Sequence, residues 1–279
     1  MLYLVLAIVS STLITVFMRL SEGKSKNELS LLSMNYLSCS VMAFLFMEGC
    51  QIFPAHDKLS IVLLLGVIGG GLYLWAFLLL KWNVKTSGVT LPATFMKLGV
   101  LVPTVLAAAV FKEELRPSTI AGIFLALAAI VLLKEKSAQK TKNAAGLILL
   151  LVGGGMADAM SKIYDQSAPS ELSGHFLFYV FFVAFALCII LVLAKKGRFC
   201  LWDVLFGLLI GIPNYFSSRF LLLSLRDIPA VVAYPTFSAG TIILVAICGK
   251  LLFKESFTRR KMIALSIILL ALALLNLPK

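Results

Sequence analysis

Three charged residues lie inside long apolar stretches, and their side chains are the ones best placed to bind a polar ligand: Lys97, Asp158 and Arg219. Charges inside membrane-spanning segments are rare and usually face a cavity or a partner. Lys97 has no acid within one helical turn, whereas Asp158 can pair with Lys162 four residues later. Arg219 lies near the end of its stretch, where snorkelling to the interface is the alternative. The three charges together favour a zwitterion or an anion as ligand.

Polar side chains accompany these charges at helical spacing. Two trios share the spacing i, i+4, i+7, which puts each trio on one face of a helix. The trios are Thr90, Thr94 and Lys97, and Tyr234, Ser238 and Thr241. Ser and Thr can also bond their own backbone, so these hydroxyls alone are weak evidence for a ligand. Four further residues, Tyr73, Trp75, Asn214 and Tyr215, are expected to add stacking and hydrogen bonds in the same cavity.

Glycine and proline interrupt several apolar stretches, and we expect hinges at these positions. The candidate hinges are Gly70, Gly154, Pro92, Pro213 and Pro235. Interruptions at matching positions of two halves are typical of secondary transporters, whose sites lie near the bilayer midplane. The alternative is close helix packing through small residues.

The composition excludes a water-soluble fold. Of the 279 residues, 61% are hydrophobic and only 14% are charged, against about half and about a quarter in soluble domains. The net charge of +12 therefore indicates basic loops beside anionic lipid. Five scattered cysteines and two histidines make a disulfide scaffold or a metal site improbable, and no cofactor is expected. Enzyme motifs and a nucleotide-binding loop are also missing, so we expect no enzyme.

The apolar pattern predicts an all-α membrane protein with ten transmembrane helices. The predicted spans are 1–20, 31–50, 59–80, 88–111, 118–134, 144–164, 173–194, 201–224, 229–252 and 261–277. With this division, 17 Lys and Arg residues fall on one side, six on the other and two inside spans. Because cytoplasmic loops carry the excess, we expect the basic loops, including 134–142, in the cytoplasm and both termini outside.

The two halves of the chain resemble each other, which predicts two five-helix repeats, 1–137 and 138–279. Phe111-Lys112-Glu113 recurs as Phe253-Lys254-Glu255, and Pro92 recurs as Pro235. Because five is odd, the halves must enter the membrane from opposite sides. The predicted fold is thus an inverted 5+5 repeat around a central cavity.

These marks resemble the drug/metabolite transporter superfamily, specifically its ten-span EamA-like family. Phe-Lys-Glu-Glu-Leu at 111–115, followed by Gly122, is similar to that family's repeat mark. The resemblance implies a cavity lined by spans one, three, four, six, eight and nine. The first span also resembles small multidrug resistance transporters, which carry an essential Glu where this chain has Ser11. That departure argues against their proton-coupled export of hydrophobic cations and leaves Ser11 as a cavity residue.

We therefore expect a secondary active or facilitative transporter of a small metabolite, an amino acid or similar amphiphile, that works by alternating access. Export is expected from the resemblance, and Asp158 is the candidate for proton coupling. The expected location is the plasma (inner) membrane, as a monomer or homodimer, without nucleic acid as a partner. The alternatives are multidrug or organic-cation efflux and a non-transporting membrane subunit.

Overall fold

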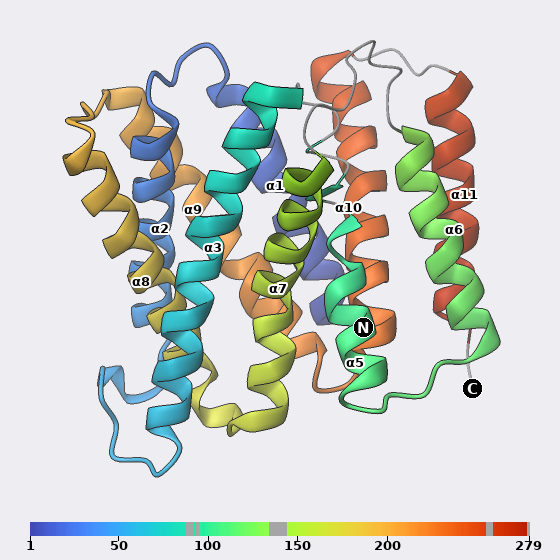
Figure 1. Ribbon diagram of the computed structural model, residues 1–279, viewed down its shortest axis with the longest axis horizontal. Helices are drawn as coiled ribbons and strands as arrows, with labels where there is room; N and C mark the ends of the chain where they lie inside the picture. Colours follow the sequence, from blue (N-terminus) through green and yellow to red (C-terminus); the bar gives the residue numbers. More distant parts are fainter. Residues whose placement is uncertain (88–91, 93–94, 97, 134–143, 255–258, 278–279) are drawn as a thin grey trace. The chain divides into compact units, whose positions relative to one another are not determined.

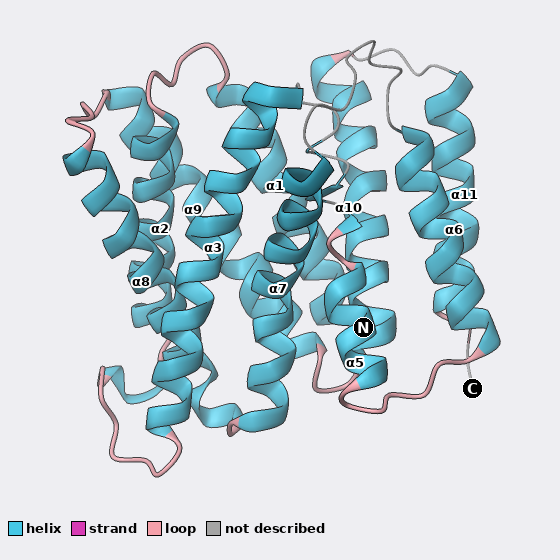
Figure 2. Cartoon of the chain, viewed as in Figure 1, coloured by secondary structure: helices cyan, strands magenta, loops and turns pink. Residues whose placement is uncertain are grey.

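The computed structural model describes residues 1–87, 92, 95–96, 98–133, 144–254 and 259–277. That part of the chain is all-α, with ten α-helices, two short 3-10 helices and no strand (Figure 2). The α-helices are α1 (Leu2–Ser21), α2 (Glu28–Leu45), α3 (Leu59–Ser87), α5 (Leu101–Ala109), α6 (Pro117–Leu133), α7 (Ala144–Ser167), α8 (Ser173–Ala194), α9 (Leu201–Ser224), α10 (Ala230–Phe253) and α11 (Arg259–Leu275). Each predicted span overlaps one of them, so the all-α architecture is confirmed.

Most of the described helices have the length and composition that a bilayer requires. Seven of those described (α1, α2, α3, α7, α8, α9 and α10) are long and apolar enough to cross a membrane, and α6 and α11 are shorter apolar helices. A helix satisfies its backbone groups within one segment, which hydrocarbon demands because it offers no water as a partner.

Several helix ends differ from the predicted spans, among them the ends of α2 and α3. Helix α2 stops at Leu45 rather than at residue 50, and the short helix η1 (Glu48–Cys50) follows, with Gly49 at a φ of 73°. Helix α3 continues past residue 80, where Asn83 donates to the carbonyls of Leu79 and Gly146, both at 2.9 Å. The apolar run marks where the segment is hydrophobic, whereas hydrogen bonding decides where the helix ends.

The chain divides into two compact units, and each takes segments from both halves of the sequence. Unit 1 comprises Met1, Trp75–Lys162 and Leu225–Lys279, and unit 2 comprises Leu2–Leu74 and Ile163–Ser224. The predicted repeats, 1–137 and 138–279, do not coincide with these two units, and the division into repeats stays a prediction.

Unit 2 is built on close contacts at glycines. Helix α9 packs against α1 and α2, and α2 packs against α8; α2 and α8 lie side by side in Figure 1. Gly207 and Gly211 of α9 face α2 so tightly that a Cβ at Gly211 would lie 2.4 Å from the Ser38 Cβ and 2.5 Å from the Asn35 carbonyl oxygen. Gly66 and Gly70 of α3 face α8 in the same way. Small residues therefore set the helix spacing in both pairs.

Helices of unit 1 also contact each other closely at glycines. Helices α6 and α11 form a close pair (Figure 1, green and red) in which Gly122 meets the Leu275 side chain and the Ala271 carbonyl. Gly155 of α7 lies against Gly99, whose carbonyl oxygen would stand 2.4 Å from an added Cβ. Ala129, Ala239 and Ile268 form a buried core among α6, α10 and α11.

The repeated Phe-Lys-Glu mark has a shared local conformation. Lys112, after α5, and Lys254, at the end of α10, both have a φ of 53°. This left-handed conformation is uncommon for a residue with a side chain. The match supports the register of the predicted repeat, while the inverted relation between the halves stays a prediction.

Substitution of Gly211 by Ala tests the packing of α9 on α2. The new methyl group must displace backbone, so we expect a loss of about 1–3 kcal/mol and a lower unfolding temperature in detergent. Gly71→Ala is the matched control, because a Cβ there meets nothing within 4 Å. It should leave the unfolding temperature unchanged or raise it. Equal effects of the two substitutions would contradict the packing role.

Candidate functional site

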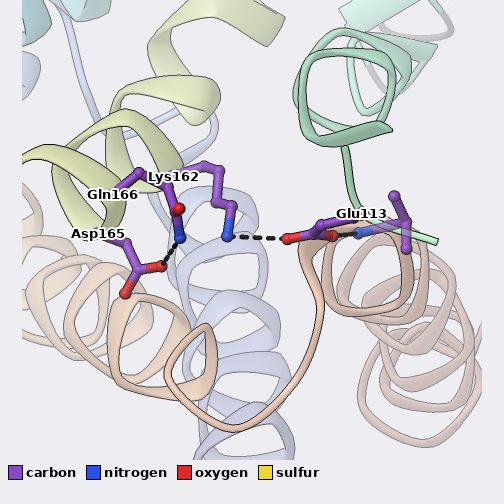
Figure 3. Close-up of polar contacts among 5 residues, drawn as sticks. Glu113, Lys162, Asp165 and Gln166 are labelled. Atoms are coloured by element: carbon purple, nitrogen blue, oxygen red, sulfur yellow. Dashed lines mark hydrogen bonds and ion pairs between the residues drawn. The ribbon is translucent and has the colours of Figure 1, made fainter. Parts of the chain in front are cut away.

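A buried ion pair ties α7 to the segment after α5 in unit 1. The Lys162 Nζ lies 2.8 Å from the Glu113 Oε1, and the two side chains are only 5% and 14% exposed. Figure 3 shows the lysine side chain reaching across to the carboxylate. The same ammonium group lies 5.7 Å from the centre of the Phe111 ring. Phe111 and Glu113 of the repeat mark thus hold one lysine from two sides.

Glu113 also binds the first turn of α10. Its Oε2 accepts a hydrogen bond from the Val231 backbone N–H at 3.0 Å, where the positive end of the helix dipole favours a carboxylate. One turn farther along each helix, the Tyr234 hydroxyl donates to the Asp158 carbonyl oxygen at 3.0 Å. Helices α7 and α10 are therefore joined at two successive levels.

The other predicted site residues of unit 1 are placed less closely together. The Asp158 side chain is exposed, and Trp75 packs its ring against Gly153. Gly154 has open space beside it, and Pro92 and Pro235 are buried in helical segments. Lys97 and Thr94 lie outside the described residues. The roles assigned to these residues stay predictions.

In unit 2 a polar cluster surrounds the proline inside α9. The Asn214 Nδ2 donates to the buried Asn35 Oδ1 at 3.2 Å, and the Cys39 thiol donates to the Gly211 carbonyl at 3.2 Å. Ser38 donates to the Leu208 carbonyl at 3.0 Å. Pro213 lies inside α9 and has no N–H to donate. Side chains of α2 thus donate to carbonyls of α9 on both sides of the residue four before this proline.

Arg219 has defined partners in the same unit. Its Nη1 donates to the Phe46 carbonyl at 3.1 Å and to the buried Tyr215 hydroxyl at 2.6 Å. The guanidinium lies 5.1 Å from the centre of the Phe46 ring. Phe46 is the C-cap of α2, where a cation complements the helix dipole. Arg219 thus holds the end of α2, a role beyond the snorkelling and ligand contact that the sequence suggested.

Aromatic rings connect the predicted residues of unit 2. Tyr73 and Tyr36 meet edge to face with ring centres 6.4 Å apart, and Phe181 contacts Tyr36, Tyr73 and Tyr215. The structure thus brings Tyr73 and Tyr215 into one aromatic cluster. Ser11 lies in α1, half-buried, and Gly70 packs against α8 inside a helix.

Sequence reasoning missed Glu113, Asn35 and Phe46. Glu113 was visible only as part of a repeat mark, because its partner Lys162 is remote in sequence. Asn35 could have been found as an amide inside a predicted span. Phe46 contacts Arg219 through its carbonyl and its ring, and no sequence pattern predicts such a contact.

A bundle of apolar helices with paired polar groups inside it defines a membrane protein, and comparison with known proteins gives its class. Residues 1–134 match the EamA-like transporter family, and residues 176–268 match the Small Multidrug Resistance protein family. The first part of the chain is thus similar to the EamA-like transporters, and a later part is similar to the small multidrug resistance proteins. The resemblance stated from the sequence is confirmed; the multidrug similarity lies in the second half rather than in the first span.

Two further proteins are similar to this chain over most of its length. An uncharacterized protein of Haemophilus influenzae (strain ATCC 51907 / DSM 11121 / KW20 / Rd) is 23% identical, over 92% of this chain and 91% of its own length. A crystal structure aligns with a TM-score of 0.78 at 13% identity, over 99% of this chain and 98% of the other. At that identity the likeness concerns the fold alone.

Glu113→Gln tests the buried ion pair of unit 1. The substitution removes the carboxylate that contacts the Lys162 Nζ, and breaking a buried ion pair costs about 3–5 kcal/mol. We expect a clear fall in the unfolding temperature of the purified chain in detergent.

The double variant Glu113→Gln/Lys162→Met is the control, since it removes both charges. It should be more stable than Glu113→Gln alone, because the buried lysine charge is removed together with the carboxylate that balances it. A double variant that is less stable than both single variants would contradict the pairing.

Proposed function

We propose that this chain is a secondary active or facilitative transporter of a small metabolite, an amino acid or similar amphiphile, and that it works by alternating access. The proposed direction is export. The proposed location is the plasma (inner) membrane, with the basic loops in the cytoplasm and both termini outside. It acts as a monomer or homodimer.

The polar cluster of unit 2 is the observation that carries this proposal. Asn35 and Asn214 bond each other inside membrane-crossing helices, next to the proline that interrupts α9. Amides in such a position are costly in hydrocarbon unless paired, and they commonly belong to a substrate path. A helix interrupted near its centre is also typical of transporter binding sites.

The residues proposed to contact substrate follow the sequence prediction. In unit 2 they are Ser11, Tyr73, Asn214, Tyr215 and Arg219, and in unit 1 they are Trp75, Asp158 and Tyr234. Lys97 and Thr94 complete the set. The carboxylate and ammonium groups of a zwitterion need a cation and an anion, which Lys97 and Asp158 supply.

Organic-cation efflux is the second candidate, because residues 176–268 match the small multidrug resistance family. Ser11 stands where that family carries an essential Glu in its first helix, so a different acid would have to bind the cation. Asp158 is the proposed acid in that case and also the proposed proton-coupling group.

Flux into proteoliposomes that contain only this chain separates the two candidates. The panel should hold amino acids, sugar phosphates, organic cations and quaternary amines, each with and without a pH gradient. Transport of zwitterions or anions supports the first proposal, whereas transport confined to organic cations supports the second. No flux with any of these solutes would contradict both.

Lys97→Ala should abolish or strongly reduce transport of the zwitterionic or anionic substrate, because the carboxylate loses its cation. Lys58→Ala is the control, since Lys58 is an exposed cation in the connection before α3. Unchanged flux in Lys97→Ala would remove Lys97 from the site.

Asn214→Leu tests the polar cluster. Leucine is close in size but cannot donate to Asn35, so we expect flux to fall by about tenfold or more, as for a lost buried hydrogen bond with its unpaired partner. The matched control is Ile212→Leu, at an exposed position of the same helix. Equal flux in both variants would contradict a role for Asn214.

A further inference from the structure

In unit 2, hydrogen bonds to one buried carboxylate join the α1–α2 connection to the α8–α9 connection. Asp203 is completely buried, and its Oδ1 accepts from the Ser25 hydroxyl at 2.7 Å and from the Lys26 backbone N–H at 2.8 Å. Its Oδ2 accepts from the Cys200 backbone N–H at 3.1 Å. This last contact is the return half of a capping box at the start of α9. One side chain thus fixes both connections.

Other contacts hold the two connections in register. The Ser30 hydroxyl donates to the Arg198 carbonyl at 3.3 Å, and a Cβ at Gly197 would lie 2.8 Å from the Asn27 side-chain nitrogen. The turn after α8 is itself tight, because the Gly197 N–H bonds the Val192 carbonyl at 2.8 Å and Lys196 has a φ of 50°. The backbone of this region is therefore preorganised.

Five exposed cations stand on this fixed backbone: Lys24, Lys26, Lys195, Lys196 and Arg198. We call them the basic patch. Within the part of the chain that the structure describes, no carboxylate forms an ion pair with any of them. Lys24 instead lies 5.3 Å from the Trp202 ring centre. The same connections carry two exposed acids, Glu22 and Glu28, so the patch keeps a net positive charge.

Apolar side chains border the basic patch. Phe199, Leu201 and Trp202 are 40%, 69% and 45% exposed. Since the patch joins the ends of four membrane-crossing helices, these side chains stand where lipid headgroups meet acyl chains. A cationic surface beside exposed apolar side chains fits an amphiphile with an anionic head.

We propose that the basic patch and its apolar border form a binding site for the headgroup of an anionic phospholipid. The phosphate binds the ammonium and guanidinium groups, and the acyl chains cover Leu201 and Trp202. Basic sites of this kind at the cytoplasmic ends of helices recognise anionic headgroups. The fixed backbone distinguishes this site from the general excess of positive charge in the loops, because it holds the cations in one arrangement.

Native mass spectrometry of the full chain in detergent tests the site, with phosphatidylglycerol as the probe and phosphatidylcholine as the zwitterionic comparison. The patch variant is Lys26→Gln/Lys195→Gln/Arg198→Gln. The matched control is Lys58→Gln/Lys254→Gln/Arg259→Gln, which removes three other exposed cations. We expect the patch variant to bind phosphatidylglycerol at least about tenfold more weakly, from the loss of three headgroup-facing charges, and the control to bind within about twofold of the native chain.

Three results would overturn the proposal. Equal weakening in both variants means that only overall charge attracts the lipid. Equal binding of phosphatidylcholine and phosphatidylglycerol means that apolar contact alone holds it. Displacement of the lipid by equimolar inorganic phosphate means that the patch binds a free anion rather than a headgroup. Gel filtration of both variants checks that they are folded.

Discussion

Hydrocarbon offers no hydrogen-bond partner, and every polar group inside this chain must find one in the protein. The contacts described above obey that constraint. Lys162 has Glu113, Asn214 has Asn35, and Arg219 has the end of α2. Even the interruption of α9 by Pro213 occurs where α2 supplies donors to the neighbouring carbonyls. The spacing of the helices follows from the same demand, because glycines let helix backbones approach closely enough for short polar side chains to reach across.

The polar groups differ in how strongly they join the helices. The carboxylate of Glu113 is shared between a lysine and the first turn of α10, so it acts as a structural joint. Asn35 and Asn214 make a single neutral contact, which a competing ligand can replace at far lower cost than a charged pair. Transport requires contacts that exchange partners, and on this ground the amide cluster is the better candidate for the substrate path.

The sequence predicted the helices well, since apolar runs of about 20 residues are a direct consequence of bilayer thickness. The ends of α2 and α3 differ from the predicted spans, because backbone hydrogen bonding rather than the length of the apolar run sets where a helix ends. Among the site residues, Tyr73, Asn214, Tyr215 and Arg219 lie in connected contacts of unit 2. Their partners Asn35, Phe46 and Phe181 could not be predicted, because side-chain pairing between remote segments leaves no mark in one sequence. The spacing of Asp158 and Lys162 allows a pair within one helix, and it does not predict the ion pair of Lys162 with Glu113 in a distant segment.

The two lysines with left-handed backbone have a consequence for the history of this fold. Lys112 and Lys254 both follow a phenylalanine and precede a glutamate, and both turn the chain at the end of a helix. A third such residue, Lys196, lacks those neighbours. A non-glycine residue accepts this conformation at a cost of about 1 kcal/mol, and its occurrence in both copies of one tripeptide is what the predicted repeat would leave in two related halves. The predicted repeat implies that diverged chains whose halves no longer align keep that tripeptide at both helix ends.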